Sequence, residues 1–150
     1  MSARLDILFA DYAEHHRSAG NQWCHSVGIP LIAFGVLGLT SVPLFRVGEW
    51  TVEAALMVIA VMAPVYLRLD ARLGTALTAV YVLLYLGARL LAWQWNLGLF
   101  VLGWVFQFIG HGVYEKRSPA FFSNLAHLLV GPLWVLNHFL PLRRTERSAS

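Results

Sequence analysis

The sequence predicts an all-α integral membrane domain, built as a bundle of four transmembrane helices followed by a C-terminal re-entrant or interfacial helical hairpin. Hydrophobic residues make up 58% of the 150 residues and charged residues only 13%, against about a quarter charged in an average soluble domain. Apolar runs of roughly 17 to 25 residues, the length that crosses a bilayer, recur along the chain. No repeat or linker divides it, so we expect residues 1–150 to form a single integral membrane domain.

Four apolar runs predict the four spans, which are Ser26 to Phe45, Val52 to Leu67, Leu73 to Trp93 and Leu97 to Val113. The third run contains one charge, Arg89, near its end, where the long side chain can reach the interface. Trp93 and Trp95 predict an interfacial turn before the fourth run, because indole rings favour the headgroup level.

The segment from Pro119 to Leu142 is apolar enough for a fifth span, but polar residues and Gly131-Pro132 interrupt it. With a cytoplasmic N-terminus and four crossings, six basic residues lie on the cytoplasmic side and two on the opposite side. The cytoplasmic residues are Arg4, Arg17, Arg68, Arg72, Lys116 and Arg117, and the other two are Arg46 and Arg89. A fifth crossing would move the basic tail to the wrong side. We therefore expect a hairpin broken at Gly131-Pro132 and two cytoplasmic termini, with a five-span arrangement as the alternative.

The N-terminal residues contain acids and no long apolar run, so we expect no cleaved signal peptide. Leu5, Ile7, Leu8, Phe9 and Tyr12 could form a short amphipathic helix on the membrane surface.

Composition also excludes several functions. The single cysteine, Cys24, allows neither an intramolecular disulfide nor a multi-cysteine zinc site. A net charge of +3 is too small and too scattered to predict nucleic-acid binding. The sequence contains no nucleophile elbow, Walker loop or dinucleotide-binding motif.

The histidines predict a metal site at one membrane face. In the four-span arrangement all six fall on the cytoplasmic side, and the start of the first span lies beside the end of the fourth; they are His15, His16, His25, His111, His127 and His138. Neutral imidazole is a common ligand of iron, zinc and copper. We expect His16, His25 and His111 to bind one ion, with His127 as the fourth ligand and His15 as an alternative to it.

Two polar residues lie one helical turn from these histidines. Asn21 precedes His25 by four residues, and Glu115 follows His111 by four, so each pair shares a helix face. We expect both to support the site by orienting the rings, although Glu115 could also ligate the metal or pair with a neighbouring cation. We expect Gly20 to break the helix and to bend His16 back toward His25.

These residues resemble two sequence blocks of a known family. The segment from His16 to Leu31 fits the pattern H-x4-N-x3-H-x2-G-x-P, and that from Gln107 to Ala120 fits Q-F-x-G-H-x3-E-x3-P-A. Both patterns are similar to those of a family of small membrane proteins that includes the yeast-type 2-hydroxy-fatty-acid dioxygenase of fatty-acid α-oxidation. The resemblance covers about Tyr12 to Leu136 and matches His16, His25 and His111 to the motif histidines.

The resemblance implies an iron(II)-dependent dioxygenase of the bacterial inner membrane or the endoplasmic reticulum, with a 2-hydroxy fatty acid and O2 as substrates and membrane lipid around it. Such an acid can chelate iron(II) through its carboxylate and hydroxyl oxygens, and cleavage between C1 and C2 shortens the chain by one carbon. Two alternatives stay open on the residues alone. One is a non-enzymatic lipid- or haem-binding membrane protein, and the other is a zinc-dependent membrane hydrolase. The oligomeric state is not predicted.

Overall fold

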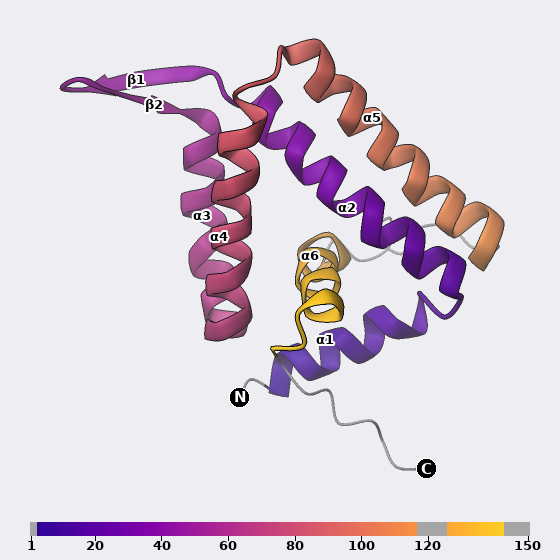
Figure 1. The fold of residues 1–150 in the computed structure, drawn as a ribbon. Helices are drawn as coiled ribbons and strands as arrows, with labels where there is room; N and C mark the ends of the chain where they lie inside the picture. Colours follow the sequence, from indigo (N-terminus) through magenta and orange to yellow (C-terminus); the bar gives the residue numbers. More distant parts are fainter. Residues whose placement is uncertain (1–2, 117–125, 143–150) are drawn as a thin grey trace.

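The computed structural model describes residues 3–116 and 126–142. Helices dominate this part of the chain, as predicted. In order, the elements are α1 (Ala3–Glu14), α2 (Ala19–Leu39), β1 (Pro43–Val47), β2 (Trp50–Glu53), α3 (Ala54–Leu69), α4 (Ala71–Ala88), α5 (Trp93–Ile109), the π-helix η1 (Gly110–Glu115) and α6 (Ala126–Phe139). The helices form two antiparallel pairs, α2 with α5 and α3 with α4 (Figure 1), and α1 and α6 lie between the lower ends of these pairs.

Within the described residues, three helices are long and apolar enough to cross a membrane, namely Ala19–Leu39, Ala71–Ala88 and Trp93–Glu115. The second expected span corresponds to α3, which is apolar but has only 16 residues. The outer faces of these helices are apolar as well, since Val61, Leu83 and Val101 are all more than half exposed. A bundle of four spans therefore stays a prediction, of which three members have the required length.

The first span is displaced from its predicted bounds. α2 begins at Ala19 instead of Ser26, because the Ser18 side chain accepts a hydrogen bond from the backbone N–H of Asn21 and caps the helix. It ends at Leu39, where the Thr40 hydroxyl donates to the Val36 carbonyl. The bounds predicted from the apolar run are therefore wrong at both ends of this helix, because its first turn is polar and the last predicted residues are not helical.

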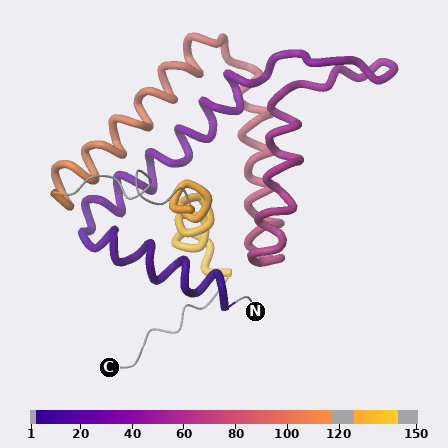
Figure 2. Tube along the Cα trace, turned by 180° about the vertical axis from the view of Figure 1, so that it is seen from behind, coloured from indigo at the N-terminus to yellow at the C-terminus, as the bar shows by residue number. Residues whose placement is uncertain are grey.

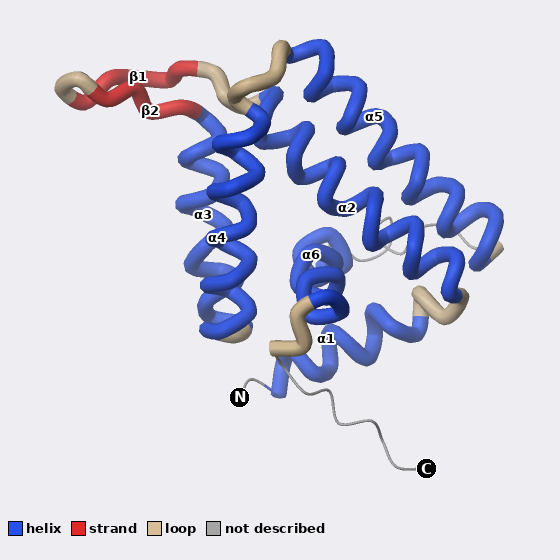
Figure 3. Tube along the Cα trace, in the orientation of Figure 1, coloured by secondary structure: helices blue, strands red, loops and turns tan. Residues whose placement is uncertain are grey.

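The residues from Pro43 to Glu53 form an antiparallel β-hairpin that an all-α prediction did not include (Figure 3). Pro43 lacks the N–H that would continue α2, and Gly48 adopts a φ of 59° in the turn, a conformation that favours glycine. Glu53 anchors the end of the hairpin, since it accepts a hydrogen bond from Tyr85 and pairs with Arg89 at 3.0 Å. Arg89 therefore contacts a carboxylate within the protein.

The predicted turn at Trp93 and Trp95 is also wrong, because both residues lie in the first turn of α5. α4 ends at Ala88, five residues before the predicted end of the third span. The Asn96 side chain closes the connection by donating to the Ala88 carbonyl at 3.1 Å.

The predicted break at Gly131-Pro132 does not occur, since α6 runs through both residues. Gly131 serves close packing instead, because a Cβ atom there would lie 2.9 Å from Ile29 of α2. Residues 117–125, which include the start of the first limb of the expected hairpin, lie outside the described residues, whereas residues 126–130 of that limb are in α6.

α1 is amphipathic, as expected, and its apolar face lies inside the protein. Leu5, Phe9 and Tyr12 are buried in a cluster with residues of α3, α4 and α6, while Ile7 is exposed. The view from behind shows α1 crossing beside α6 (Figure 2). α1 is therefore held by protein contacts at the end of the bundle where the histidines gather.

Glycines allow the closest helix pair to form. α2 packs along α5, and a Cβ atom at Gly28 would lie 2.8 Å from the Gly103 carbonyl oxygen, while one at Gly103 would lie equally close to the Gly28 carbonyl. Small residues at facing positions let two backbones approach in this way. This contact brings the first turns of α2 beside the end of α5.

Candidate metal centre

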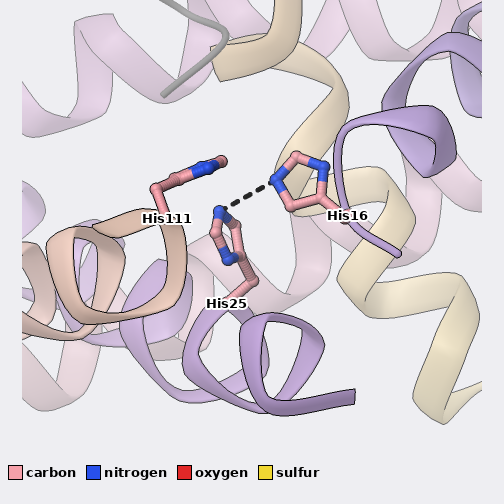
Figure 4. A group of neighbouring side chains, drawn as sticks. All are labelled: His16, His25 and His111. Atoms are coloured by element: carbon pink, nitrogen blue, oxygen red, sulfur yellow. Dashed lines mark hydrogen bonds between the residues drawn. The ribbon is translucent and has the colours of Figure 1, made fainter. Parts of the chain in front are cut away.

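Three histidines from three separate segments meet at one end of the α2 and α5 pair (Figure 4). His16 lies in the connection between α1 and α2, His25 in α2, and His111 in η1. Each is almost fully buried, with 2 to 4% of its surface exposed. One ligand atom from each lies within 4.8 Å of the others. The structure thus brings together the three residues that the sequence selected.

The α1–α2 connection directs His16 into the site. The helical hydrogen bonds stop after α1, and α2 starts at the Ser18 cap, so the chain turns at residues 15–18. The predicted break at Gly20 is therefore wrong, because Gly20 lies in the first turn of α2. A Cβ atom at Gly20 would overlap the Tyr114 ring, which indicates that this glycine serves close packing against η1.

Two backbone carbonyls select the tautomers of His16 and His25. His16 Nδ1 donates to the Tyr12 carbonyl at 2.6 Å, and His25 Nδ1 donates to the Asn21 carbonyl at 3.0 Å. A carbonyl oxygen can only accept a hydrogen bond, so Nδ1 carries the proton in both rings. In the neutral rings, both Nε2 atoms therefore present lone pairs, the arrangement in which histidine binds metals.

These two Nε2 atoms are 3.0 Å apart (Figure 4). Two lone pairs at this separation repel each other unless a positive charge lies at the contact. A proton is disfavoured, because burial, with a smaller contribution from His25, lowers the pKa of His16 to about 3. A divalent metal ion would remove the repulsion, and His111 supplies a third imidazole for it. The donor set therefore fits a transition-metal ion.

Glu115 and Asn21 connect η1 to the start of α2. The Glu115 carboxylate accepts hydrogen bonds from the Ser18 backbone N–H at 2.8 Å and from the Asn21 side chain at 3.2 Å. Asn21 in turn holds His25 through its backbone carbonyl. The carboxylate thus fastens the turn that carries His16 and the helix that carries His25 to the element that carries His111.

His127, the expected fourth ligand, is buried at the start of α6 and contacts a residue that the sequence analysis did not select. Its Nε2 lies 2.8 Å from Asp11 Oδ2, and His15 is beside both, so the three form a second group. Asp11 is one of several acidic residues on an amphipathic helix. Only the packing of α1 on α6 distinguishes it from the other acidic residues, because this packing brings it to His127. His138 is exposed on α6 and belongs to neither group.

An apolar cavity of about 360 Å³ begins at the three histidines. It follows α2 from His25 as far as Leu37, twelve residues or about 18 Å along a helix. Side chains of α3, α4, α5 and α6 complete its wall, among them Val58, Met62, Tyr66, Tyr81, Phe100 and Trp104. An apolar cavity that ends in a few polar groups is typical of a site for a small amphipathic molecule.

Gln107 supplies a further polar group to this cavity. It lies one helical turn before His111 and is buried, and its Nε2 atom has no hydrogen-bond partner among residues 3–116 and 126–142. A buried donor without an acceptor costs free energy, so a bound ligand that offers an oxygen would stabilise it.

Comparison with known proteins gives two consistent matches. Residues 3–141 match the family described as 2-hydroxy-palmitic acid dioxygenase Mpo1-like. The chain is also 36% identical over 136 residues to the 2-hydroxy-palmitic acid dioxygenase MPO1 of Saccharomyces cerevisiae, a match that covers 86% of this chain and 75% of the yeast protein. No solved structure matches the sequence. The histidines of the centre and the apolar cavity lie within the matched region, and the chain belongs to the Mpo1-like family.

Proposed function

We propose that the protein is an iron(II)-dependent dioxygenase that removes one carbon from 2-hydroxy fatty acids. Membership of the family and the identity to the yeast enzyme support a dioxygenase of this substrate class. The observation that carries the proposal for this chain is the close pair of Nε2 lone pairs, which a cation would stabilise, beside an apolar cavity. Bound iron(II) supplies the activation of O2 and a chelation site for the hydroxyl and carboxylate oxygens.

The residues of the chain hold the ion and orient the substrate. His16, His25 and His111 hold the iron, and the acyl tail lies in the cavity along α2 toward Leu37. The Gln107 amide donates a hydrogen bond to an oxygen of the substrate head group. The apolar wall excludes water from the reacting carbons. His127 is not among these ligands, because its ring contacts Asp11.

The location of the site follows from the same arrangement. The three membrane-length helices support a location in a membrane, and the histidines lie at one end of α2 and α5. We propose that this end faces the cytoplasm, together with both termini, because basic residues are concentrated on that side. A fatty acid from the surrounding lipid would then enter tail first, with its head group at the cytoplasmic face.

The experiment that tests this function measures metal and turnover together. Protein purified without oxygen and loaded with Fe(II) should consume 2-hydroxyhexadecanoate only when O2 is present and should form the acid one carbon shorter. Hexadecanoate, which lacks the hydroxyl oxygen for chelation, should not react. Bound zinc instead of iron, together with hydrolysis at a rate independent of O2, would indicate a hydrolase. Tight substrate binding without turnover would indicate a lipid-binding protein.

Variants of the three histidines provide the second half of the test. His16→Ala, His25→Ala and His111→Ala should each abolish turnover and remove one equivalent of iron from a protein that still inserts into the membrane. His138→Ala is the matched control, because this exposed histidine belongs to neither group, and it should behave as wild type. Full turnover in His111→Ala would contradict the proposal.

A further inference from the structure

A second group of potential metal ligands lies next to the three histidines of the proposed iron site. It consists of Asp11 in α1, His15 directly after α1 and His127 in the first turn of α6. One ligand atom from each lies within 4.8 Å of the others. Asp11 and His15 are four residues apart, so they project from the same side of the C-terminal part of α1. The packing of α6 on α1 adds His127 to them.

His127 carries the first argument that this group binds a ligand. Only 7% of its surface is exposed, and its Nδ1 atom has no hydrogen-bond partner among the described residues. Its Nε2 atom lies 2.8 Å from Asp11 Oδ2. The contact with Asp11 thus satisfies only one of the two ring nitrogens, and a simple pair between α1 and α6 leaves a buried polar atom unexplained.

His15 carries the second argument. Its Nδ1 atom is 2.9 Å from the backbone carbonyl of Asp11, to which it can only donate. In the neutral ring the Nε2 lone pair is therefore free of a proton, as in the two rings of the iron site. A hydrogen bond from Nδ1 to a carbonyl is the usual way in which proteins orient a histidine for metal binding.

The chemistry of the group and its exposure indicate the kind of ion. Two imidazoles with one carboxylate are a donor set that binds iron(II) and similar divalent ions and leaves coordination positions open. The Asp11 and His15 side chains are 38% and 39% exposed, so an ion can enter from outside the protein. A carboxylate among the ligands distinguishes this group from the three buried histidines.

The two groups are neighbours without sharing a residue. The Tyr12 ring stacks on His16 at a centroid distance of 3.9 Å and lies 5.6 Å from the ring of His127. At the end of α1, Asp11 and His15 belong to one group and His16 to the other. We propose that Asp11, His15 and His127 form a second site for a divalent transition-metal ion, next to the histidine site and on the side of α1 and α6.

Metal stoichiometry tests this proposal without depending on turnover. Protein saturated with Fe(II) in the absence of oxygen and then desalted should contain two equivalents of iron. Asp11→Asn and His15→Gln should each retain one equivalent, and so should His16→Ala, whereas the double variant of His15 and His16 should retain none. Glu14→Gln, which alters an exposed carboxylate of the same helix, is the control and should retain two.

The His15→Gln variant separates a metal site from a structural ion pair, because it leaves the Asp11–His127 contact in place. The metal-free variant should unfold at the same temperature as the metal-free wild type. The variant saturated with Fe(II) should nevertheless contain one equivalent of iron fewer than the wild type. A single equivalent of iron in the wild-type protein would overturn the proposal. If that one equivalent were lost in both His16→Ala and His127→Ala, His127 would be a ligand of the first ion. Two equivalents in His15→Gln would also overturn it. Failure of the dioxygenase function would appear differently, as normal metal content without turnover.

Discussion

At the scale of single residues, two backbone hydrogen bonds orient two of the buried histidines. They hold the Nδ1 protons of His16 and His25 and leave both Nε2 lone pairs in contact at 3.0 Å. This arrangement is a property of neutral rings, so it depends on pH. Burial of both rings also penalises a charged imidazolium, so a proton is disfavoured at this contact.

The lowered pKa of His16 predicts how the metal-free protein responds to acid. The pKa falls from 6.5 in the unfolded chain to about 3 in the folded one, so between these values the unfolded state binds more protons. The contribution of His16 to stability is therefore full above about pH 6.5 and is lost as the pH falls toward 3. Unfolding of the metal-free protein, measured from pH 8 to pH 4, should show this loss, and His16→Gln should reduce it. A pH profile unchanged in that variant would contradict the assignment.

Glu115 and Asn21 provide a second prediction at this scale. Both hold the turn at the start of α2 and neither is one of the three imidazole donors, so Glu115→Gln and Asn21→Ala should weaken iron binding by about 10- to 100-fold without abolishing it. Equilibrium competition with a chelator of known affinity would measure this. Complete loss of iron from a folded Glu115→Gln protein would instead make the carboxylate a direct ligand.

Residue identities in the site could be predicted from the sequence only in part. His16, His25 and His111 were predictable because a four-span topology places their segments at one end of a bundle. Asp11 was not, because its role depends on α6 packing against α1, more than a hundred residues away in the chain. Gln107 lies in the motif around His111, but only the structure shows that its buried amide lacks a partner among the described residues.

At the scale of elements, the approach of α2 to α5 positions His25 beside His111. The Gly28 and Gly103 backbones make this approach possible. Gly103→Leu should therefore push the helices apart and lower the affinity for iron, although residue 103 is about two turns from His111.

Gly98→Leu is the control for this prediction, because Gly98 is on the same helix and a Cβ atom there meets nothing within 4 Å. The control variant should bind iron as wild type does. Iron titration of both variants in the same detergent checks the expectation. Equal affinities would show that the α2–α5 contact is not needed to assemble the site.

Apolar length predicted the existence of the helices better than their ends. The ends of α2 depend on the Ser18 side chain, which accepts a hydrogen bond, and on the Thr40 and Ser41 hydroxyls, which donate them. A search for apolar runs does not detect these contacts. The hairpin could not be predicted, because the sequences of its short, apolar strands resemble the end of a membrane span. Gly131 next to Pro132 predicts a break, whereas in the structure the missing side chain of Gly131 leaves room for Ile29 and Tyr12.

At the scale of the whole molecule, the ends of the described chain lie at the same end of the bundle (Figure 1). This arrangement is compatible with an even number of crossings and with α6 on the side of α1. We predict that tags at the N-terminus and the C-terminus are both accessible from the cytoplasm and both protected from the opposite side. Tags on opposite sides would indicate that α6, or another helix, crosses once more.

The wide separation of the three histidines in sequence has a consequence for biosynthesis. His111 follows His25 by 86 residues, so a ribosome working at about 5 to 20 residues per second adds it about 4 to 17 s later. Until then the nascent chain offers two imidazoles of the centre, and in the folded protein the packing of α5 along α2 adds the third. We therefore expect a metal ion to bind at this centre only after the helix that carries His111 has been translated.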